Sequence, residues 1–273
     1  MKIKIAYFTS TGNTLWLCEK AKEMMEAKGH TVNLYEIINE RDEFTSAECD
    51  LMGFFYPVWG SNPPDPMVEY REQMAFGDGK KVFLVGDCCA LNGDTGYFFK
   101  KILDEKGYDV FFTDHLYMPT NFNLPYEPEN KWKRVPLEDE KNEILCKAQV
   151  KLSEICNCIM AEERRIDGKN LVSRAMGALQ RKTYWMGDGY KSHFSIAEDK
   201  CINCDLCIRM CPANNITKDA NGKKVFGDKC ILCVKCYNLC PKNAVLICKT
   251  SIDDEKYRRY KGPSKDIKPV EYR

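Results

Sequence analysis

Eight of the sixteen cysteines in this chain form one spacing that occurs twice. In each run, three cysteines are separated by two residues each, and a fourth cysteine followed by proline comes after three more residues. This is the thiolate spacing of bacterial two-cluster sites, in which the fourth cysteine of each run binds the cluster of the other run. We therefore predict two [4Fe–4S] clusters, one bound by Cys201, Cys204, Cys207 and Cys240, the other by Cys230, Cys233, Cys236 and Cys211.

Other uses of these cysteines fit the spacing poorly. A zinc ribbon needs two ligand pairs separated by a longer stretch, whereas each run here places four cysteines within eleven residues. A disulfide framework requires an oxidising compartment, and nothing in the sequence resembles a signal peptide. The flanks also repeat, because an Asp-Lys pair precedes both Cys201 and Cys230. The two runs therefore predict a compact, pseudo-symmetric module for electron transfer.

The composition argues against several classes of partner. The formal net charge of +1 provides no basic field for nucleic acid. No apolar run approaches the roughly 20 residues needed to cross a bilayer. Bases alternate with aromatic residues at 256–261, where packing of the tail on the protein surface is favoured over RNA binding. We expect a cytoplasmic protein of an anaerobe, with no nucleic-acid or membrane partner, because that compartment protects thiols and clusters.

A second informative segment follows the first predicted strand, at residues 2–8. It is a hydroxyl-rich turn that leads into a helical pattern ending near Gly29, and it consists of Thr9, Ser10, Thr11, Gly12, Asn13 and Thr14. Free N–H groups at a helix start, together with the helix dipole and the hydroxyl donors, favour an anion. The alternative is an ordinary Ser/Thr-rich turn that caps a helix.

The turn lacks the features of a nucleotide triphosphate or dinucleotide site. A Walker loop would supply a lysine, and a dinucleotide fold would show three spaced glycines; neither is present. A phosphate held only by neutral donors is typical of a monoester that neither leaves nor reacts. We therefore predict FMN rather than ATP.

Strand and helix patterns alternate through the first half of the chain. Predicted strands lie at 2–8, 31–37, 50–56, 81–86 and 108–117, and predicted helices follow at 66–74, 95–106 and 141–164. This alternation implies an α/β fold, with a parallel sheet covered on both faces. Ligands of such sheets lie at the carboxyl ends of the strands.

The phosphate turn resembles that of flavodoxins, and the order of modules resembles the flavodoxin-fused ferredoxins of anaerobic bacteria and archaea. The resemblance covers about residues 1–250 and rests mostly on the cysteine runs. It implies a doubly wound, five-stranded parallel sheet of order 2-1-3-4-5 that holds FMN, joined to a small C-terminal α+β ferredoxin domain. The expected division is a flavodoxin-like domain at 1–164, a linker at 165–194, a ferredoxin domain at 195–250 and a tail at 251–273.

The resemblance further implies a flavin-contacting loop after the third strand, formed by Pro57, Val58, Trp59 and Gly60. The Trp59 ring is the candidate to stack on the isoalloxazine, because Trp has a large planar apolar face. The Gly60 peptide is the candidate to turn a carbonyl toward flavin N5. The alternative for Trp59 is a surface ring that plugs the loop.

A second implied loop, after the fourth strand, contains Asp87, Cys88 and Cys89, whose backbone groups are expected to reach the pyrimidine edge of the flavin. A thiol there would act as an acid or form a disulfide, although free cysteines usually just pack. The second stacking tyrosine of simple flavodoxins is missing, which leaves the outer flavin face open. Asn121, after the fifth strand, is a candidate flavin donor, although an Asn-containing turn is the commoner role.

Clusters transfer single electrons, whereas FMN takes one or two. We therefore predict a redox carrier that moves low-potential electrons between two [4Fe–4S] clusters and FMN, with ferredoxin-linked enzymes or a small-molecule acceptor as partners. The alternatives are a ferredoxin-dependent flavin reductase and a redox sensor, so enzymatic activity stays open. The three histidines are dispersed and predict no dyad or ligand set, and the sequence reveals no proton source.

Overall fold

The computed structural model describes residues 1–39, 49–122, 134–268 and 270–272, and of residues 184–187 the backbone alone. The chain forms two compact units. The first contains Met1–Thr9, Asn13–Met118 and Glu140–Thr183, and the second contains Ser10–Gly12, Pro119–Asp139 and Tyr184–Arg273. The sheet predicted from the sequence lies in the first unit, and both cysteine runs lie in the second.

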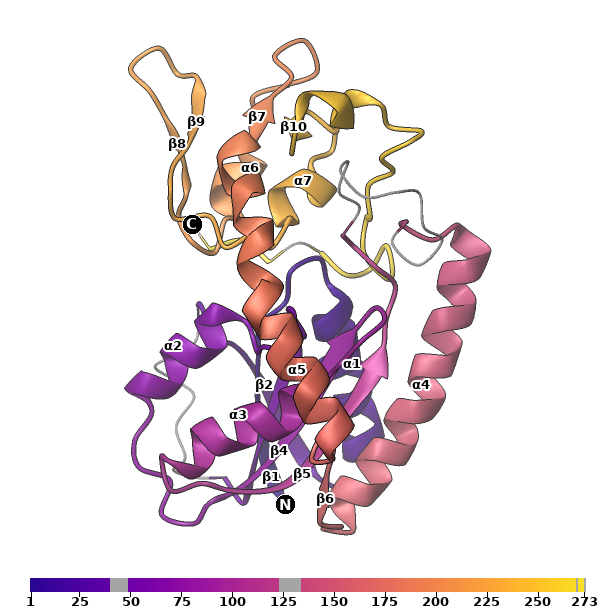
Figure 1. Ribbon diagram of the computed structural model, residues 1–273. Coiled ribbons are helices and arrows are strands. Elements are labelled where there is room, and N and C mark those ends of the chain that lie inside the picture. Colours follow the sequence, from indigo (N-terminus) through magenta and orange to yellow (C-terminus); the bar gives the residue numbers. More distant parts are fainter. Residues whose placement is uncertain (40–48, 123–133, 269, 273) are drawn as a thin grey trace. The chain divides into compact units, whose positions relative to one another are not determined.

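The first unit is built on a six-stranded parallel sheet of order β2-β1-β3-β4-β5-β6 (Figure 1). Its strands are β1 (Lys2–Tyr7), β2 (Thr31–Glu36), β3 (Leu51–Pro57), β4 (Lys81–Cys88), β5 (Asp109–Tyr117) and β6 (Arg165–Ile166). The predicted α/β fold and the order 2-1-3-4-5 are confirmed.

The sixth strand lies in the segment expected to be a linker. β6 pairs with Phe112 and Thr113 of β5. Two residues are too few to show an alternating pattern, so a strand of this length is not visible in the sequence. Its position matters because it brings the segment that follows, including Asp167, to the edge of β5.

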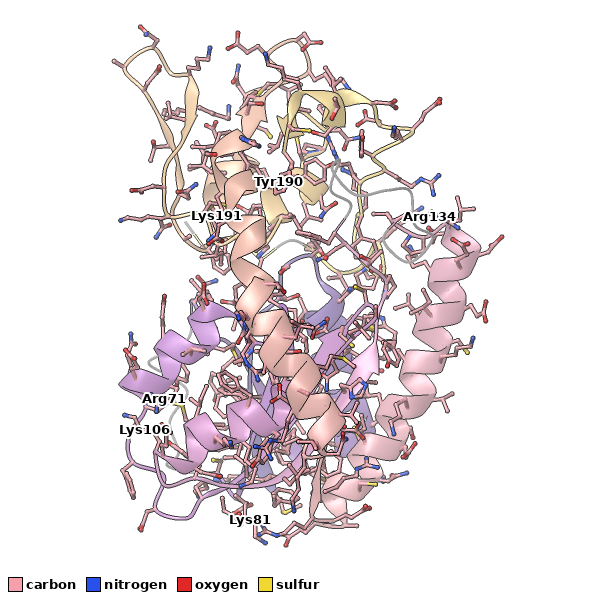
Figure 2. The ribbon with its side chains drawn as sticks, viewed as in Figure 1. Arg71, Lys81, Lys106, Arg134, Tyr190 and Lys191 are labelled. Atoms are coloured by element: carbon pink, nitrogen blue, oxygen red, sulfur yellow. The ribbon has the colours of Figure 1, made fainter. Side chains whose placement is uncertain are left out.

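Helices cover both faces of the sheet. They are α1 (Asn13–Glu26), α2 (Asp65–Gln73), α3 (Thr95–Asp104), α4 (Glu138–Met160) and α5 (Leu171–Thr183). Lys28, just beyond α1, donates to Asn157 of α4, so these two helices are neighbours. In Figure 1, α2, α3 and α5 lie in front of the sheet. Figure 2 shows Arg71 of α2 close to Lys106, just beyond α3, and the Arg71 guanidinium pairs with Glu105 at 2.8 Å.

The core of the first unit lies between the sheet and its helices. Every residue of β3 is buried, as is typical of a parallel strand covered on both sides. A Cβ on Gly53 would lie 2.2 Å from the Phe83 ring, so glycine at this point of β3 allows the neighbouring strand to insert an aromatic ring. Hydrophobic burial of this kind is the main favourable contribution to folding.

The second unit is small and rich in turns. Its strands form two antiparallel pairs, β7 (Ser195–Ile196) with β10 (Val245–Leu246) and β8 (Ile216–Lys218) with β9 (Lys224–Phe226). Its α-helices are α6 (Leu206–Arg209) and α7 (Lys235–Leu239), and two 3₁₀ segments, η2 (Tyr184–His193) and η3 (Lys249–Ile252), flank the cysteine-rich part. Tyr190 and Lys191 mark the end of η2 in Figure 2. A core that includes Phe194, Ile216 and Tyr237 packs beside the cysteines.

Candidate functional site

The second unit contains two cavities, and each is lined by four of the eight cysteines. Cys201, Cys204, Cys207 and Cys240 line one, which we call the first cavity. Cys211, Cys230, Cys233 and Cys236 line the other, the second cavity. The cavities are open on one side and offer about 330 and 370 Å³ of space, so they suit two occupants of similar size. Each cavity therefore takes three cysteines from one run and the fourth from the other run.

The backbone around the cavities repeats along with the cysteines. Asn203 and Asp205 have φ of 55° and 59°, and Leu232 and Val234, at the corresponding places 29 residues later, have φ of 54° and 53°. Left-handed backbone at non-glycine residues is uncommon, so its recurrence at matching positions marks a constrained loop. Both runs therefore fold into the same turn around their cysteines.

Backbone amides point at the sulfur atoms in a repeated way. Asn215 N donates to Cys211 Sγ and Ala244 N donates to Cys240 Sγ, both at 3.2 Å. These bonds stabilise thiolate charge without a cation, and hydrogen bonds to cluster sulfurs are one of the means by which a protein tunes an iron–sulfur centre. The sulfur atom of the fourth cysteine in each run therefore accepts the same backbone hydrogen bond.

Burial makes the free thiolates costly. It raises the pKa of the Cys207 thiol to about 11 and that of Cys233 to about 12, and it also raises the pKa of Cys236. A metal centre in each cavity would bind these sulfurs as thiolates and release their protons. Four converging sulfur atoms in a confined apolar space fit an iron–sulfur cluster, which thiolates hold.

In the predicted phosphate turn, Thr9, Ser10, Thr11, Gly12, Asn13 and Thr14 are all buried, and α1 begins at Asn13. Ser10 is 4% exposed, and its hydroxyl has no hydrogen-bond partner among the described residues. A buried hydroxyl without a partner is costly, so the turn retains a donor for a ligand. Gly12 has a φ of 100°, a conformation that favours glycine.

Two other hydroxyls of the turn are engaged by the protein. Thr14 Oγ1 donates to Asp87 Oδ1 at 2.6 Å, and Thr11 Oγ1 accepts from Asn121 Nδ2 at 2.8 Å. Asn121 therefore orients Thr11 of the turn, and its donation to a flavin stays a prediction. Burial raises the pKa of Asp87 to about 6, and the Thr14 hydrogen bond opposes this shift.

The loop after β3 forms a tight turn. Pro57 is buried at the end of the strand, Val58 N donates to Asp87 O at 2.8 Å, and Trp59 and Asn62 exchange two backbone hydrogen bonds of 2.9 and 3.0 Å. Gly60 and Ser61 between them have φ of 55° and 61°, the positive values of a type I′ turn.

Trp59 itself is half-buried and contacts Phe8 edge-on at 5.7 Å between ring centroids. The edge contact fixes the ring while leaving part of it accessible. Stacking of Trp59 on a flavin stays a prediction.

Cys88 and Cys89, after β4, differ in environment. Cys88 is buried, and burial raises the pKa of its thiol far above the ordinary range, whereas Cys89 is exposed. A thiol with so high a pKa is a poor nucleophile and a poor acid at neutral pH. Cys88 therefore fits the packing role that the sequence left open.

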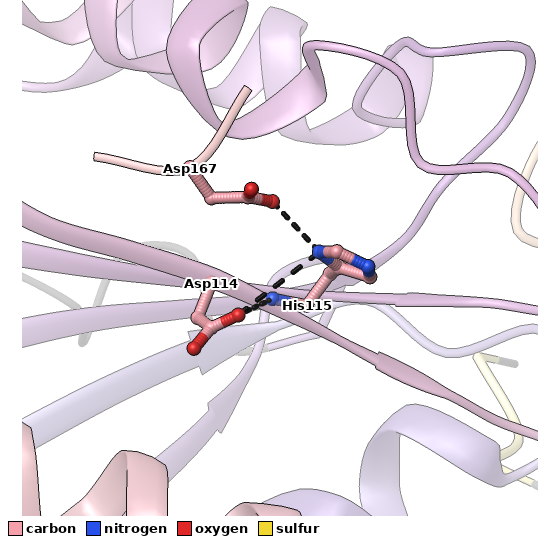
Figure 3. A group of neighbouring side chains, drawn as sticks. All are labelled: Asp114, His115 and Asp167. Carbon is pink, nitrogen blue, oxygen red and sulfur yellow. Dashed lines mark hydrogen bonds and ion pairs between the residues drawn. The ribbon is translucent and has the colours of Figure 1, made fainter. Parts of the chain in front are cut away.

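The expectation that the histidines form no dyad is wrong for His115. His115 Nδ1 lies 2.7 Å from Asp167 Oδ2, and Asp114 lies beside them (Figure 3). His115 is paired in register with Gly86, so the dyad lies near the carboxyl ends of β4 and β5. The sequence carried no signal for it, because 52 residues separate the partners.

Hydrogen bonds connect the dyad to the loop after β4. Asn92 Nδ2 donates to Asp167 Oδ2 at 2.9 Å, and Asp167 N donates to Thr113 Oγ1 at 2.7 Å. Asp167 therefore holds the imidazole in one orientation while it is itself fixed. A histidine held in this way is suited to proton transfer.

The three side chains in Figure 3 satisfy the spacing of a metal site, but one of them, Asp114, is already paired with two cations. Asp114 Oδ2 pairs with Arg165 at 2.5 Å and with Lys151 at 3.5 Å. A divalent cation would have to displace these two cations. The arrangement therefore favours proton transfer over metal binding.

Residues 200–245 match the family model described as a 4Fe-4S dicluster domain. This segment lies inside the predicted ferredoxin domain and contains all eight cysteines of the two runs. No curated protein matches the chain. Within the part of the chain that the structure describes, no helix is long and apolar enough to cross a membrane.

Solved structures similar to this chain include a flavodoxin from the domain Archaea, with 16% identity over 57% of this chain and 99% of that chain, at a TM-score of 0.36. The two-electron reduced flavodoxin of Megasphaera elsdenii is 20% identical over 55% of this chain and 98% of its own, at a TM-score of 0.36. The flavodiiron protein of Giardia intestinalis is 14% identical over 59% of this chain and 38% of its own, also at 0.36.

The strand order of the first unit is itself informative. An open parallel sheet of order 2-1-3-4-5 with helices on both faces is the flavodoxin-like form of the doubly wound fold. The matched iron–sulfur domain follows it in the chain. The chain thus combines a parallel sheet of flavodoxin-like strand order with a following segment that matches a 4Fe–4S dicluster domain.

Proposed function

We propose that this protein carries low-potential electrons between two [4Fe–4S] clusters and a bound FMN. The observation that supports this most is the pair of cavities, each lined by four cysteines with one exchanged between the runs. The first cluster would be held by Cys201, Cys204, Cys207 and Cys240, and the second by Cys211, Cys230, Cys233 and Cys236. Ligand exchange of this kind is the bacterial two-cluster arrangement.

The FMN assignment is supported by the phosphate turn. Its side chains are neutral, its residues are buried at the start of α1, and Ser10 keeps an unpartnered hydroxyl. Neutral donors and a helix start suit a phosphate monoester. Trp59 would pack against the ring system, and the backbone of Asp87 and Cys89 would meet its pyrimidine edge.

The division of labour follows from the chemistry of the two kinds of centre. The clusters supply one-electron transfer, and FMN when bound supplies one- or two-electron chemistry. This chain's residues would hold the centres, donate backbone hydrogen bonds to sulfur atoms and keep both kinds of centre on one polypeptide. Covalent linkage raises the effective concentration of one centre near the other.

Analysis of iron, sulfide and flavin in protein purified without oxygen tests the proposal. We expect roughly eight iron, eight sulfide and one FMN per chain, with two interacting [4Fe–4S] signals in the reduced EPR spectrum. Cys233→Ala should lose one cluster, whereas Cys248→Ala, outside both cavities, should keep both. Zinc in place of iron would refute the cluster assignment, and clusters without flavin would refute the assignment of the phosphate turn.

A second candidate, a flavin-dependent reductase of a small molecule, is favoured by the His115–Asp167 dyad. Two-electron reduction of an organic acceptor consumes protons, and a histidine oriented by a carboxylate can deliver one. Reoxidation of the reduced protein by a quinone, which needs protons, and by a one-electron metal complex, which does not, separates the two functions. If the protein is a reductase, His115→Gln should slow the reaction with the quinone but not the reaction with the metal complex. Equal quinone rates in wild type and variant would favour the carrier function instead.

A further inference from the structure

The two halves of the second unit share a backbone but not the charges around it. Lys224, at the start of β9, lines the first cavity, and its side chain is 3% exposed. Its ammonium lies 3.7 Å from Cys201 Sγ and 2.9 Å from Asn203 Oδ1. It also pairs with Asp205 Oδ1 at 3.2 Å. A buried cation is therefore held directly against a predicted cluster ligand.

The residues that hold Lys224 belong to the first half alone. Asn203 and Asp205 occupy two left-handed positions of the first run, whereas Leu232 and Val234 occupy the matching positions of the second. The apolar pair offers no side-chain acceptor for an ammonium group. The repeated turn therefore has two side chains that bind Lys224 in the first half and two apolar side chains in the second half.

Other cations also gather at the ligands of the first cavity. Arg209 Nη1 donates to Cys204 O at 2.9 Å, and Lys261 Nζ donates to Cys240 O at 2.8 Å. Three of its four cysteines thus have a cationic side chain bonded to their sulfur or carbonyl.

The second cavity is lined by a buried lysine as well, and the charge of this lysine acts on Cys233. Lys235 Nζ donates to the Tyr272 hydroxyl at 2.9 Å and lies 4.3 Å from the centre of that ring. At the first cavity, by contrast, the Lys224 ammonium lies 3.7 Å from a ligand sulfur atom.

We propose that Lys224 raises the reduction potential of the cluster held by Cys201, Cys204, Cys207 and Cys240, so that this cluster accepts the first electron. The inference rests on the proposed two-cluster function. Reduction adds one negative charge to a cluster that four thiolates already make anionic. A fixed cation at the sulfur atoms stabilises the reduced form more than the oxidised form, and burial keeps solvent and salt from screening it. The electron comes from an external low-potential donor.

The size of the effect follows from the distance. At an effective dielectric constant of about 20, a unit charge 3.7 Å away would change an equilibrium by about three powers of ten. The added electron is spread over the cluster, and roughly a quarter of it at the Cys201 corner leaves about a tenfold effect. A tenfold change in a one-electron couple corresponds to about 59 mV.

A redox titration of the whole protein, followed by EPR of samples frozen at set potentials, tests the inference. We expect two reduction steps in wild type, and Lys224→Met should lower the higher of them by roughly 59 mV, a tenfold loss of reduced cluster at fixed potential. Lys223→Met is the matched control. Lys223 is the adjacent residue, is 65% exposed and pairs with Glu198. The Lys223→Met substitution removes the same charge and should leave both reduction steps at their wild-type potentials.

Asp205→Asn provides a test of opposite sign. It removes the anion beside Lys224, and Asn tolerates the left-handed backbone at this position. The higher step should move upward in this variant.

An unchanged higher step in Lys224→Met, equal shifts in Lys223→Met, or a shift confined to the lower step would each overturn the inference while leaving the two-cluster function intact. A wild-type protein with fewer than two clusters by iron and sulfide analysis would overturn both.

Discussion

Replacement of Asp87 by asparagine should stabilise the first unit, by an amount that depends on pH. Asp87 lies near the end of β4, is 5% exposed and accepts a hydrogen bond from Thr14 Oγ1. Burial raises its pKa from the ordinary value of 3.8 to about 6. Asparagine is neutral at every pH and keeps an oxygen acceptor for Thr14, so it resembles the protonated acid.

The magnitude follows from linkage between protonation and folding. Because the folded protein holds the Asp87 proton more tightly, stability is highest below pH 4, falls as the pH rises from about 4 to 6, and is constant above that. A pKa change from 3.8 to about 6 corresponds to about 3 kcal/mol. Asp87→Asn should therefore gain about 1.5 kcal/mol at pH 5 and about 3 kcal/mol at pH 7.

Native-state hydrogen exchange of the β4 amides measures this gain without unfolding the iron–sulfur domain. The opening free energy of Asp87→Asn and wild type should diverge between pH 5 and pH 7. Asp78→Asn, an exposed turn position with a φ of 46°, makes the same charge change and should show no such divergence. A gain independent of pH, a loss of protection, or equal gains in both variants would refute the assignment of a buried, partly protonated carboxyl.

Two further predictions concern the phosphate turn and α5. Ser10→Ala should weaken FMN binding by about 10- to 100-fold in an equilibrium titration, because it removes one hydrogen bond to a charged group. The control Ser173→Ala, on α5, should bind FMN as the wild type does. Equal affinities in all three proteins would contradict the role of the unpartnered Ser10 hydroxyl. Gly177→Ala should destabilise α5 by about 1–3 kcal/mol, as measured by hydrogen exchange, because its Cβ would lie 1.7 Å from Asp94 Oδ1. The control is Gly189→Ala, whose Cβ would meet nothing within 4 Å. Equal effects of the two substitutions would rule out this overlap.

The overlap at Gly177 reflects how α5 is held. Arg181 forms two bonds with Asp94, of 2.6 and 3.0 Å, and Asp94 is 4% exposed. The carboxylate cannot move away from a methyl group without disturbing this partly buried pair, which is the reason for the expected cost of about 1–3 kcal/mol. A segment with mixed polar and apolar residues therefore becomes a firmly placed helix.

The strands and helices of the first unit were largely predictable from local patterns. In α4, Ala148, Leu152, Ile155 and Ile159 recur at helical spacing, and all four are buried. The four central strands are bounded by turns and are strongly apolar. Hydrophobic periodicity is a local property of the chain, so it predicts a helix or strand even when the elements that pack against it are not known. The strand β6 was not predicted, because two residues are too few to show a periodic pattern.

The contacts that shape the candidate sites were not predictable in this way. His115 and Asp167 are 52 residues apart, and Lys224 is 23 residues from Cys201. Neither pair has a spacing that a local rule recognises. Each depends on how strands and turns are placed, since β6 delivers Asp167 to the edge of β5, and the β8–β9 hairpin, drawn in Figure 1, delivers Lys224 to its cavity.

The sequence alone determined the chemistry that this protein can host, because cluster binding depends on the spacing of thiolates along a short stretch, and the cysteine runs lie in a segment that matches a 4Fe–4S dicluster domain. It also determined the parallel α/β fold, through alternating local patterns. Only the tertiary structure decided which charges surround each cavity and which carboxylate orients His115. Electrostatic interactions act through space, and positions along the chain do not reveal those distances until the chain is folded.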